Sequence, residues 1–239
     1  MTFSRRPSLL ATSHGTSDPS GQAAVINLVR SVAHAMPKTA VQGGYVDVQQ
    51  PDVATSLELV GDDSPVIIVP LLLSAGYHVR VDLAHAAREA APRFVTVTGA
   101  LGPDPRLTQL LAQRLREAGA VGEDSVVIAA AGSTDGQAVE DCRAVARALS
   151  VALGKPVTVG FLSAAEPTLA DAVTAARHTA PAARVVIASY LLAPGYFAGL
   201  THAVGADLVT NPLLAHGEEP PRQLVDVIID RYSAMALAM

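Results

Sequence analysis

The sequence predicts an α/β fold with two tandem homologous domains, each a four-stranded parallel sheet flanked by helices. Two observations carry this prediction: short apolar runs alternate with segments of helical spacing, and three sequence blocks of the first half recur in the second. Runs that are nearly continuous in apolar residues are typical of strands buried on both faces of a parallel sheet. Their alternation with helices indicates βαβ units with right-handed crossovers.

Eight short apolar runs are the expected strands, and they cover residues 8–13, 40–48, 66–73, 94–101, 125–131, 157–162, 184–192 and 208–214. The segments between them show helical spacing. Apolar side chains share one face over 22–36 and again over 107–118. We also expect helices over 81–91, which would place His85 on the surface, and over 137–153.

The repeat consists of three blocks in the same order. Ser8 aligns with Ser125, Tyr45 with Phe161 and Leu71 with Tyr190, at offsets of 117, 116 and 119 residues. A nearly constant offset indicates two homologous halves. Because the glycines at 119 and 122 interrupt the helical pattern between them, we place the domains at 1–120 and 121–239.

Composition excludes several classes of protein. Half of the 239 residues are apolar, which is enough for a packed core, and a net charge of −5 without a Lys/Arg cluster argues against a nucleic-acid partner. Cys142 is the single cysteine, so we expect no disulfide or cysteine-based metal site, and a small apolar role for Cys142 itself. Without a run near the roughly 20 residues of a membrane span, or a signal peptide, we expect a cytoplasmic protein with no membrane partner.

Ligands of open α/β sheets bind outside the carboxyl ends of the strands. The first half carries His14, Asp47 and His78 at the ends of its first three expected strands. The matching positions of the second half hold Ala131, Ser163 and Phe197. Because the three polar residues are replaced together, we interpret them as contributors to one site that only the first half retains.

Two histidines and a carboxylate form a mixed nitrogen and oxygen ligand set that suits a divalent transition metal. Without a cysteine the site would be open and labile, as for a metal that is handed on. Each histidine could instead be an ordinary solvated loop residue. Asp47 could cap the following helix or accept loop N–H groups.

The loops add two expectations. The N–H groups of 14–21, with the helix that follows, suit an anionic ligand. Arg80 could pair with a substrate carboxylate or lie in solvent. The chain has neither a G-x-x-x-x-G-K-S/T motif nor a G-x-G-x-x-G after its first strand, so no nucleotide is expected.

These motifs resemble the sirohydrochlorin chelatase family, the small ATP-independent class II chelatases. The resemblance lies in residues 13–19 (SHGTSDP), 70–82 (PLLLSAGYHVRVD) and 103–105 (PDP), and it extends over almost the whole chain. It implies tandem chelatase-like domains, a tetrapyrrole in the cleft between them, and metal binding by His14 and His78. The family often has Glu where this chain has Asp47.

The resemblance implies a lyase that inserts Fe²⁺, for sirohaem, or Co²⁺, for cobalamin, into sirohydrochlorin. The alternatives are another metal, such as Ni²⁺, and a non-catalytic carrier of metal or tetrapyrrole. We expect a monomer, since one chain would complete the cleft. The expected metal ligands are His14, His78 and Asp47, and the expected substrate contacts are Ser13, Gly15, Thr16, Ser74, Ala75, Gly76, Tyr77, Arg80 and Phe197.

Overall fold

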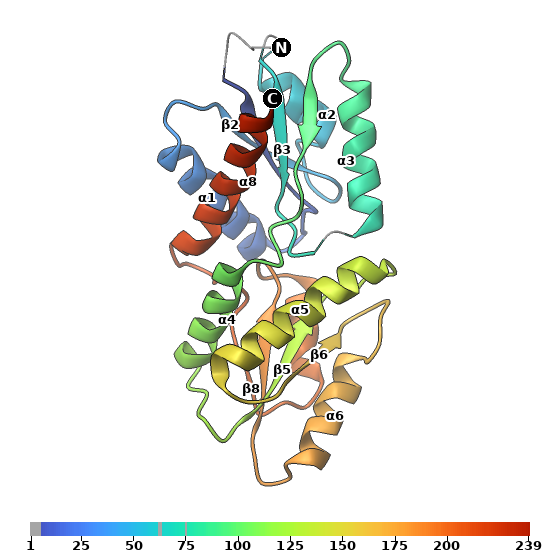
Figure 1. Ribbon diagram of the computed structural model, residues 1–239, viewed down its shortest axis with the longest axis vertical. Coiled ribbons are helices and arrows are strands. Elements are labelled where there is room, and N and C mark those ends of the chain that lie inside the picture. Colours follow the sequence, from blue (N-terminus) through green and yellow to red (C-terminus); the bar gives the residue numbers. More distant parts are fainter. Residues whose placement is uncertain (1–5, 62–63, 75) are drawn as a thin grey trace.

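Two parallel four-stranded sheets, one above the other in Figure 1, form the frame of the molecule. The computed structural model describes residues 6–61, 64–74 and 76–239, without the side chains of residues 77–80. Strand order is β2-β1-β3-β4 in the first sheet and β6-β5-β7-β8 in the second. The predicted fold class, with two tandem halves of the same topology, is confirmed.

The elements of the first half are β1 (Ser8–Ser13), α1 (Pro19–Ala35), β2 (Val41–Tyr45), α2 (Val53–Leu59), β3 (Val66–Pro70), α3 (Tyr77–Glu89), β4 (Val95–Val97) and α4 (Pro105–Glu117). Those of the second half are β5 (Ser125–Ala130), α5 (Gly136–Leu153), β6 (Val157–Phe161), α6 (Leu169–Thr179), β7 (Val185–Tyr190), α7 (Tyr196–Leu200), a 3-10 turn (Thr201–Ala203), β8 (Leu208–Val209) and α8 (Arg222–Ala238).

Each strand falls inside a predicted run, but most strands are shorter than their runs, and the edge strands β4 and β8 differ most from runs 94–101 and 208–214. Both pair on one side only, and the apolar residues that follow them leave the sheet and cross toward the other half. Helix α1 begins three residues earlier than expected. The Asp18 carboxylate accepts the N–H groups of Ser20 and Gly21 at 2.8 and 3.0 Å, and Pro19 suits the first helical position.

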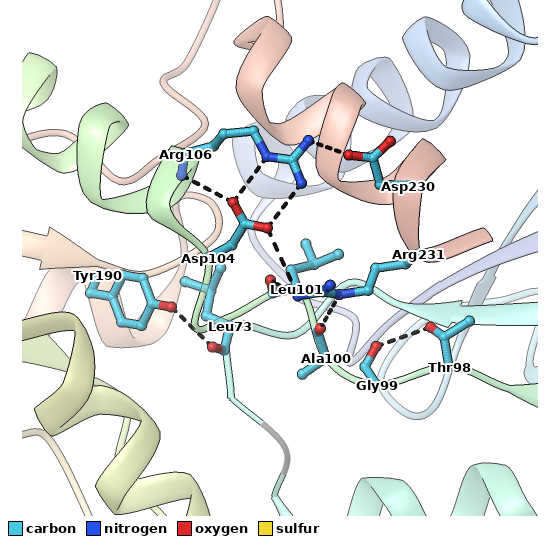
Figure 2. Close-up of polar contacts among 10 residues, drawn as sticks. All are labelled: Leu73, Thr98, Gly99, Ala100, Leu101, Asp104, Arg106, Tyr190, Asp230 and Arg231. Atoms are coloured by element: carbon cyan, nitrogen blue, oxygen red, sulfur yellow. Dashed lines mark hydrogen bonds and ion pairs between the residues drawn. The ribbon is translucent and has the colours of Figure 1, made fainter. Parts of the chain in front are cut away.

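The last helix of each half packs on the other half. Helix α4 lies against α5 and β7, and α8 lies against β3 and α1. Figure 1 shows α4 beside α5, and α8 beside α1 and β3. Arg231 of α8 donates to the carbonyl oxygens of Ala100 and Leu101 at 2.9 and 3.0 Å (Figure 2). The largest core cluster therefore contains residues of both halves, among them Leu9 and Ile128. A boundary near residue 120 separates the two sheets but stays a prediction for the domains.

Within the described ranges, no helix is long and apolar enough to cross a membrane.

Candidate metal and tetrapyrrole site

A cavity of about 560 Å³ lies where the carboxyl ends of the central strands of both sheets meet. Its wall is formed by the ends of β1, β5 and β7 and by the loops after these strands and after β3, within residues 13–17, 71–76, 130–133 and 190–198. These are the positions at which open α/β sheets bind ligands. Most of the wall is apolar, with small residues and backbone at the loops.

His14 is the first residue after β1, and it is exposed and lines the cavity. Its carbonyl oxygen accepts the N–H of Asp47 at 3.0 Å, which ties the loop after β1 to the loop after β2. Among the described residues the imidazole has no hydrogen-bond partner. A fixed backbone with an unengaged imidazole leaves a ring nitrogen available to a metal or a proton.

Gly15 makes this approach of the two loops possible. Its φ is +95°, and a Cβ atom placed on it would lie 2.3 Å from the carbonyl oxygen of Asp47. Gly132 has the same role in the second half, with a φ of +93° and a Cβ position 1.8 Å from the carbonyl oxygen of Ser163. Only glycine fits at either position, because a side chain would both strain φ and collide with backbone.

Asp47 does not line the cavity. Its carboxylate accepts the N–H of Val48 at 2.7 Å, while Val48 itself lines the cavity with φ at +60°. The residue that caps α2 is Asp52, which accepts the N–H of Thr55 at 2.8 Å. Of the two alternative roles for Asp47, acceptance of a loop N–H is therefore the one observed.

No three His, Cys, Asp or Glu side chains are close enough to hold a metal ion in the part of the chain that the structure describes. The predicted set of His14, Asp47 and His78 is not tested by this finding, because the His78 side chain lies outside that part. Ala75 and the side chains of Tyr77 and Arg80 lie outside it as well. The backbone of 77–80 forms the first turn of α3.

The remaining predicted contacts are brought to the cavity. Ser13, Gly15, Thr16, Ser74 and Gly76 line it from the first half, and Phe197 lines it from the second. Phe197 is 37% exposed, and its ring meets that of Tyr196 edge to face at 5.6 Å. Ala131 also lines the cavity. Ser163 does not line it, and its hydroxyl donates to the Ala131 carbonyl at 2.9 Å.

The N–H groups of 14–21 were expected to suit an anion, but four of them are already engaged within the chain. Asp18 accepts those of Ser20 and Gly21, the Thr16 hydroxyl accepts that of Asp18 at 3.1 Å, and the side-chain oxygen of Gln49 accepts that of Thr16 at 2.9 Å. A helix N-terminus that is capped by its own carboxylate offers fewer donors to an anion. His85 lies on the surface as expected, with its Nε2 atom 3.2 Å from Oε1 of Glu89.

Many of the lining residues were not predicted to belong to the site, and two of them, Cys142 and Tyr190, are buried side chains with a titratable group. Cys142 is buried as expected, yet it also lines the cavity. Burial raises the pKa of its thiol to about 11, and the nearby Ser74 side chain opposes part of this rise. Tyr190 ends β7, and burial raises the pKa of its phenol well above the ordinary value. The signal for Tyr190 was its place in the repeat, where it aligns with Leu71 at the edge of a site loop.

The family comparison covers both halves: the CbiX family model matches residues 8–118 and 125–205. A sirohydrochlorin cobaltochelatase of Sulfolobus acidocaldarius is 26% identical over 114 residues, which are 46% of this chain and 90% of that protein. A second, from Sulfurisphaera tokodaii, is 25% identical over 79 residues, 32% of this chain and 66% of that protein. The first of these relatives therefore corresponds in length to about one half of this chain.

Solved structures share the fold over the whole chain. SirB from Bacillus subtilis with Fe³⁺ matches with a TM-score of 0.77 at 18% identity, covering 97% of this chain and 96% of that one. CbiX, described as the terminal enzyme of sirohaem biosynthesis in denitrifying bacteria, matches with a TM-score of 0.65 at 21% identity, covering 93% and 98%. With the family model matched in both halves, the chain belongs to the CbiX family, the class II sirohydrochlorin chelatases that its loop motifs resemble.

Proposed function

We propose that this protein inserts a divalent metal, Fe²⁺ or Co²⁺, into sirohydrochlorin without ATP. The observation that carries the proposal is the position of His14, an unengaged imidazole in a cavity built from the strand ends of both halves. Family membership supports the same reaction class. The relatives point to more than one metal, since two are named cobaltochelatases and one solved structure contains Fe³⁺.

Insertion of a metal removes two protons from the pyrrole nitrogens and water from the metal. A neutral imidazole near pH 7 can hold the metal or accept a proton, and we assign these roles to His14 and His78. Asp47 would act as a third ligand only if its free oxygen turned toward the cavity, because the other accepts the Val48 N–H. The apolar wall would exclude water from the reacting face of the macrocycle.

Substrate binding is assigned to the residues on both sides of the cavity. Phe197 would pack on the macrocycle, and Arg80 would pair with one of its carboxylates. The loop residues Ser13, Gly15, Thr16, Ser74, Ala75, Gly76 and Tyr77 would surround the ring edge. Since the two halves complete the cavity in one chain, we propose a monomer, and we propose that it acts in the cytoplasm.

Absorption spectroscopy tests the activity. Protein at catalytic concentration, sirohydrochlorin and Co²⁺ or Fe²⁺ are mixed without oxygen, and the spectral change of metal insertion is followed. We expect many turnovers with the wild type and a strong loss of activity with His14→Ala. His85→Ala should be as active as the wild type, because its side chain lies on the surface beside Glu89.

A rate equal to that without protein would contradict the proposal and leave a carrier of metal or tetrapyrrole. If the protein accelerates insertion, competition between Fe²⁺, Co²⁺ and Ni²⁺ at limiting concentration identifies the preferred metal. Sedimentation of the purified chain would test the monomer.

A further inference from the structure

We infer that Tyr190, in the second half, is a positioning residue that holds the site loop of the first half. The site loop is defined as the described residues 71–74 and 76, between β3 and α3. The inference rests on the proposed function, since this loop leads directly into the helix turn that contains His78. It concerns a side chain that belongs to the half without the site histidines.

The contact is a part-buried hydrogen bond between the halves. Tyr190 is 2% exposed, and its hydroxyl donates to the carbonyl oxygen of Leu73 at 3.0 Å, as Figure 2 shows. Leu73 lies in the middle of the site loop, and both residues line the cavity. The bond favours this relative position, because separation would leave the buried Tyr190 hydroxyl without its acceptor.

On one side, the bond packs against the backbone of Gly102. A Cβ atom on Gly102 would lie 2.2 Å from the Tyr190 hydroxyl and 2.3 Å from the Leu73 carbonyl oxygen, so the glycine backbone packs directly against the pair. The segment that contains Gly102 is held in turn. Arg231 binds the carbonyls of Ala100 and Leu101, as Figure 2 shows.

A chain of ion pairs, also drawn in Figure 2, links the residues just after Gly102 to α8. Asp104 accepts from Arg106 at 2.9 Å, and Arg106 donates to Asp230 of α8 at 2.6 Å. The Tyr190 hydroxyl and the Leu73 carbonyl therefore pack against a backbone segment that is held by side chains of α4 and α8.

The other anchors of the site loop divide between the two halves. From its own half, Leu71 donates to the Thr12 carbonyl at 2.7 Å and Leu72 accepts from Leu101 at 2.8 Å. From the second half, the Cys142 side chain lies close enough to that of Ser74 to affect the pKa of the thiol. The Tyr190 bond is the direct tie between the second half and the loop backbone at Leu73.

The repeat shows that this contact is made by the second half alone. Tyr190 aligns with Leu71, which has no hydroxyl, so the contact has no counterpart from the first half to the second. The half that lacks the site histidines thus supplies a polar anchor that the other half lacks. This is the arrangement expected if the second half has become a support for the first.

Tyr190→Phe tests the inference, because it removes one hydroxyl and keeps the ring. The matched control is Tyr232→Phe in α8: Tyr232 is 5% exposed, and its hydroxyl donates to the Pro7 carbonyl at 2.5 Å, in the same kind of bond but outside the cavity wall. We measure Co²⁺ binding by its absorption bands, metal insertion as kcat and KM for Co²⁺, and hydrogen exchange of peptides covering 71–80. A purely structural role would affect the two variants alike.

We expect the Co²⁺ Kd and the KM for Co²⁺ to rise about 10-fold in Tyr190→Phe, as is typical when a group that supports a metal ligand is removed. Exchange should increase over 71–80 in that variant only, and Tyr232→Phe should bind Co²⁺ as the wild type does. Equal Co²⁺ binding by both variants would overturn the inference while leaving the proposed function intact. A wild type that binds Co²⁺ but does not insert it would overturn the proposed function and leave this inference to be decided by the Kd values.

Discussion

The loops after β1 and β2 match those after β5 and β6 in backbone conformation and differ in chemistry. Gly15 and Gly132 have φ values of +95° and +93°, and the later residues Val48 and Ala164 have +60° and +55°. In both halves the loop carbonyl accepts an N–H at 3.0 Å, between Asp47 and His14 or between Ser163 and Ala131. The second half therefore has the same loop geometry without the proposed ligands, and its loops form the opposite wall of one cavity.

The largest difference between the halves should appear at the histidines. His14→Ala and His78→Ala should each lower the rate of metal insertion at least about 100-fold, the size expected for loss of a group that transfers protons or holds the metal. Thermal midpoints should change little, since His14 is exposed on a loop. Insertion rates and midpoints are compared with those of His85→Ala, and wild-type activity of either variant would refute its assignment.

Substitution of either loop glycine should destabilise the fold to a similar extent, but only substitution of Gly15 should weaken Co²⁺ binding. Gly15→Ala and Gly132→Ala each place a Cβ atom against a backbone oxygen, at 2.3 and 1.8 Å, and should lower the free energy of unfolding by more than about 1 kcal/mol. Urea unfolding measures this loss. Co²⁺ affinity should fall only in Gly15→Ala, because that loop carries His14; a similar fall in both variants would mean that the second loop also supports the metal.

Phe197→Ala should weaken tetrapyrrole binding about 10-fold, which corresponds to about 1.4 kcal/mol, within the range for loss of an aromatic contact and its apolar area. Fluorescence quenching of the tetrapyrrole gives the affinity, and Phe94→Ala, which alters a half-exposed phenylalanine outside the cavity wall, is the control. A lowered thermal midpoint with unchanged affinity would show instead that Phe197 packs only within its own half.

Asp47→Ala should have a smaller effect on insertion than either histidine variant, less than about 10-fold, because water can replace a carboxylate on a labile metal. It should also cost about 0.5–1.5 kcal/mol of stability, since the Val48 N–H loses its acceptor. Ser163→Ala removes the matching polar side chain of the second half and should leave insertion unchanged. A 100-fold loss in Asp47→Ala would make the carboxylate an essential ligand.

The smallest effect is expected from restoring one histidine. Ala131→His places an imidazole at the position that matches His14, but Ser163 and Phe197 still stand where the other ligands would be. One imidazole makes no chelate, so Co²⁺ stoichiometry by equilibrium dialysis should remain that of the wild type. A second bound Co²⁺ would show that the second half needs less than the full set of ligands.

Local patterns in the sequence determined the fold class, the repeat and the position of His14. Short apolar runs specify buried parallel strands wherever they lie in the chain, and the carboxyl end of a strand is readable from its last apolar residue. For the same reason the runs overestimated β4 and β8: an apolar residue that leaves an edge strand to enter a core shared with the other half has the same local pattern.

Only the tertiary structure decided which residues from distant segments meet. The exchange of α4 and α8, the lining position of Cys142, the turning of the Asp47 carboxylate to the Val48 N–H, and the bond from Tyr190 to Leu73 all depend on packing between residues far apart or on loop backbone conformation. Periodicity reports which face of an element is buried. It does not report what that face is buried against, because the partner is chosen by the shape and hydrogen-bonding needs of the whole core.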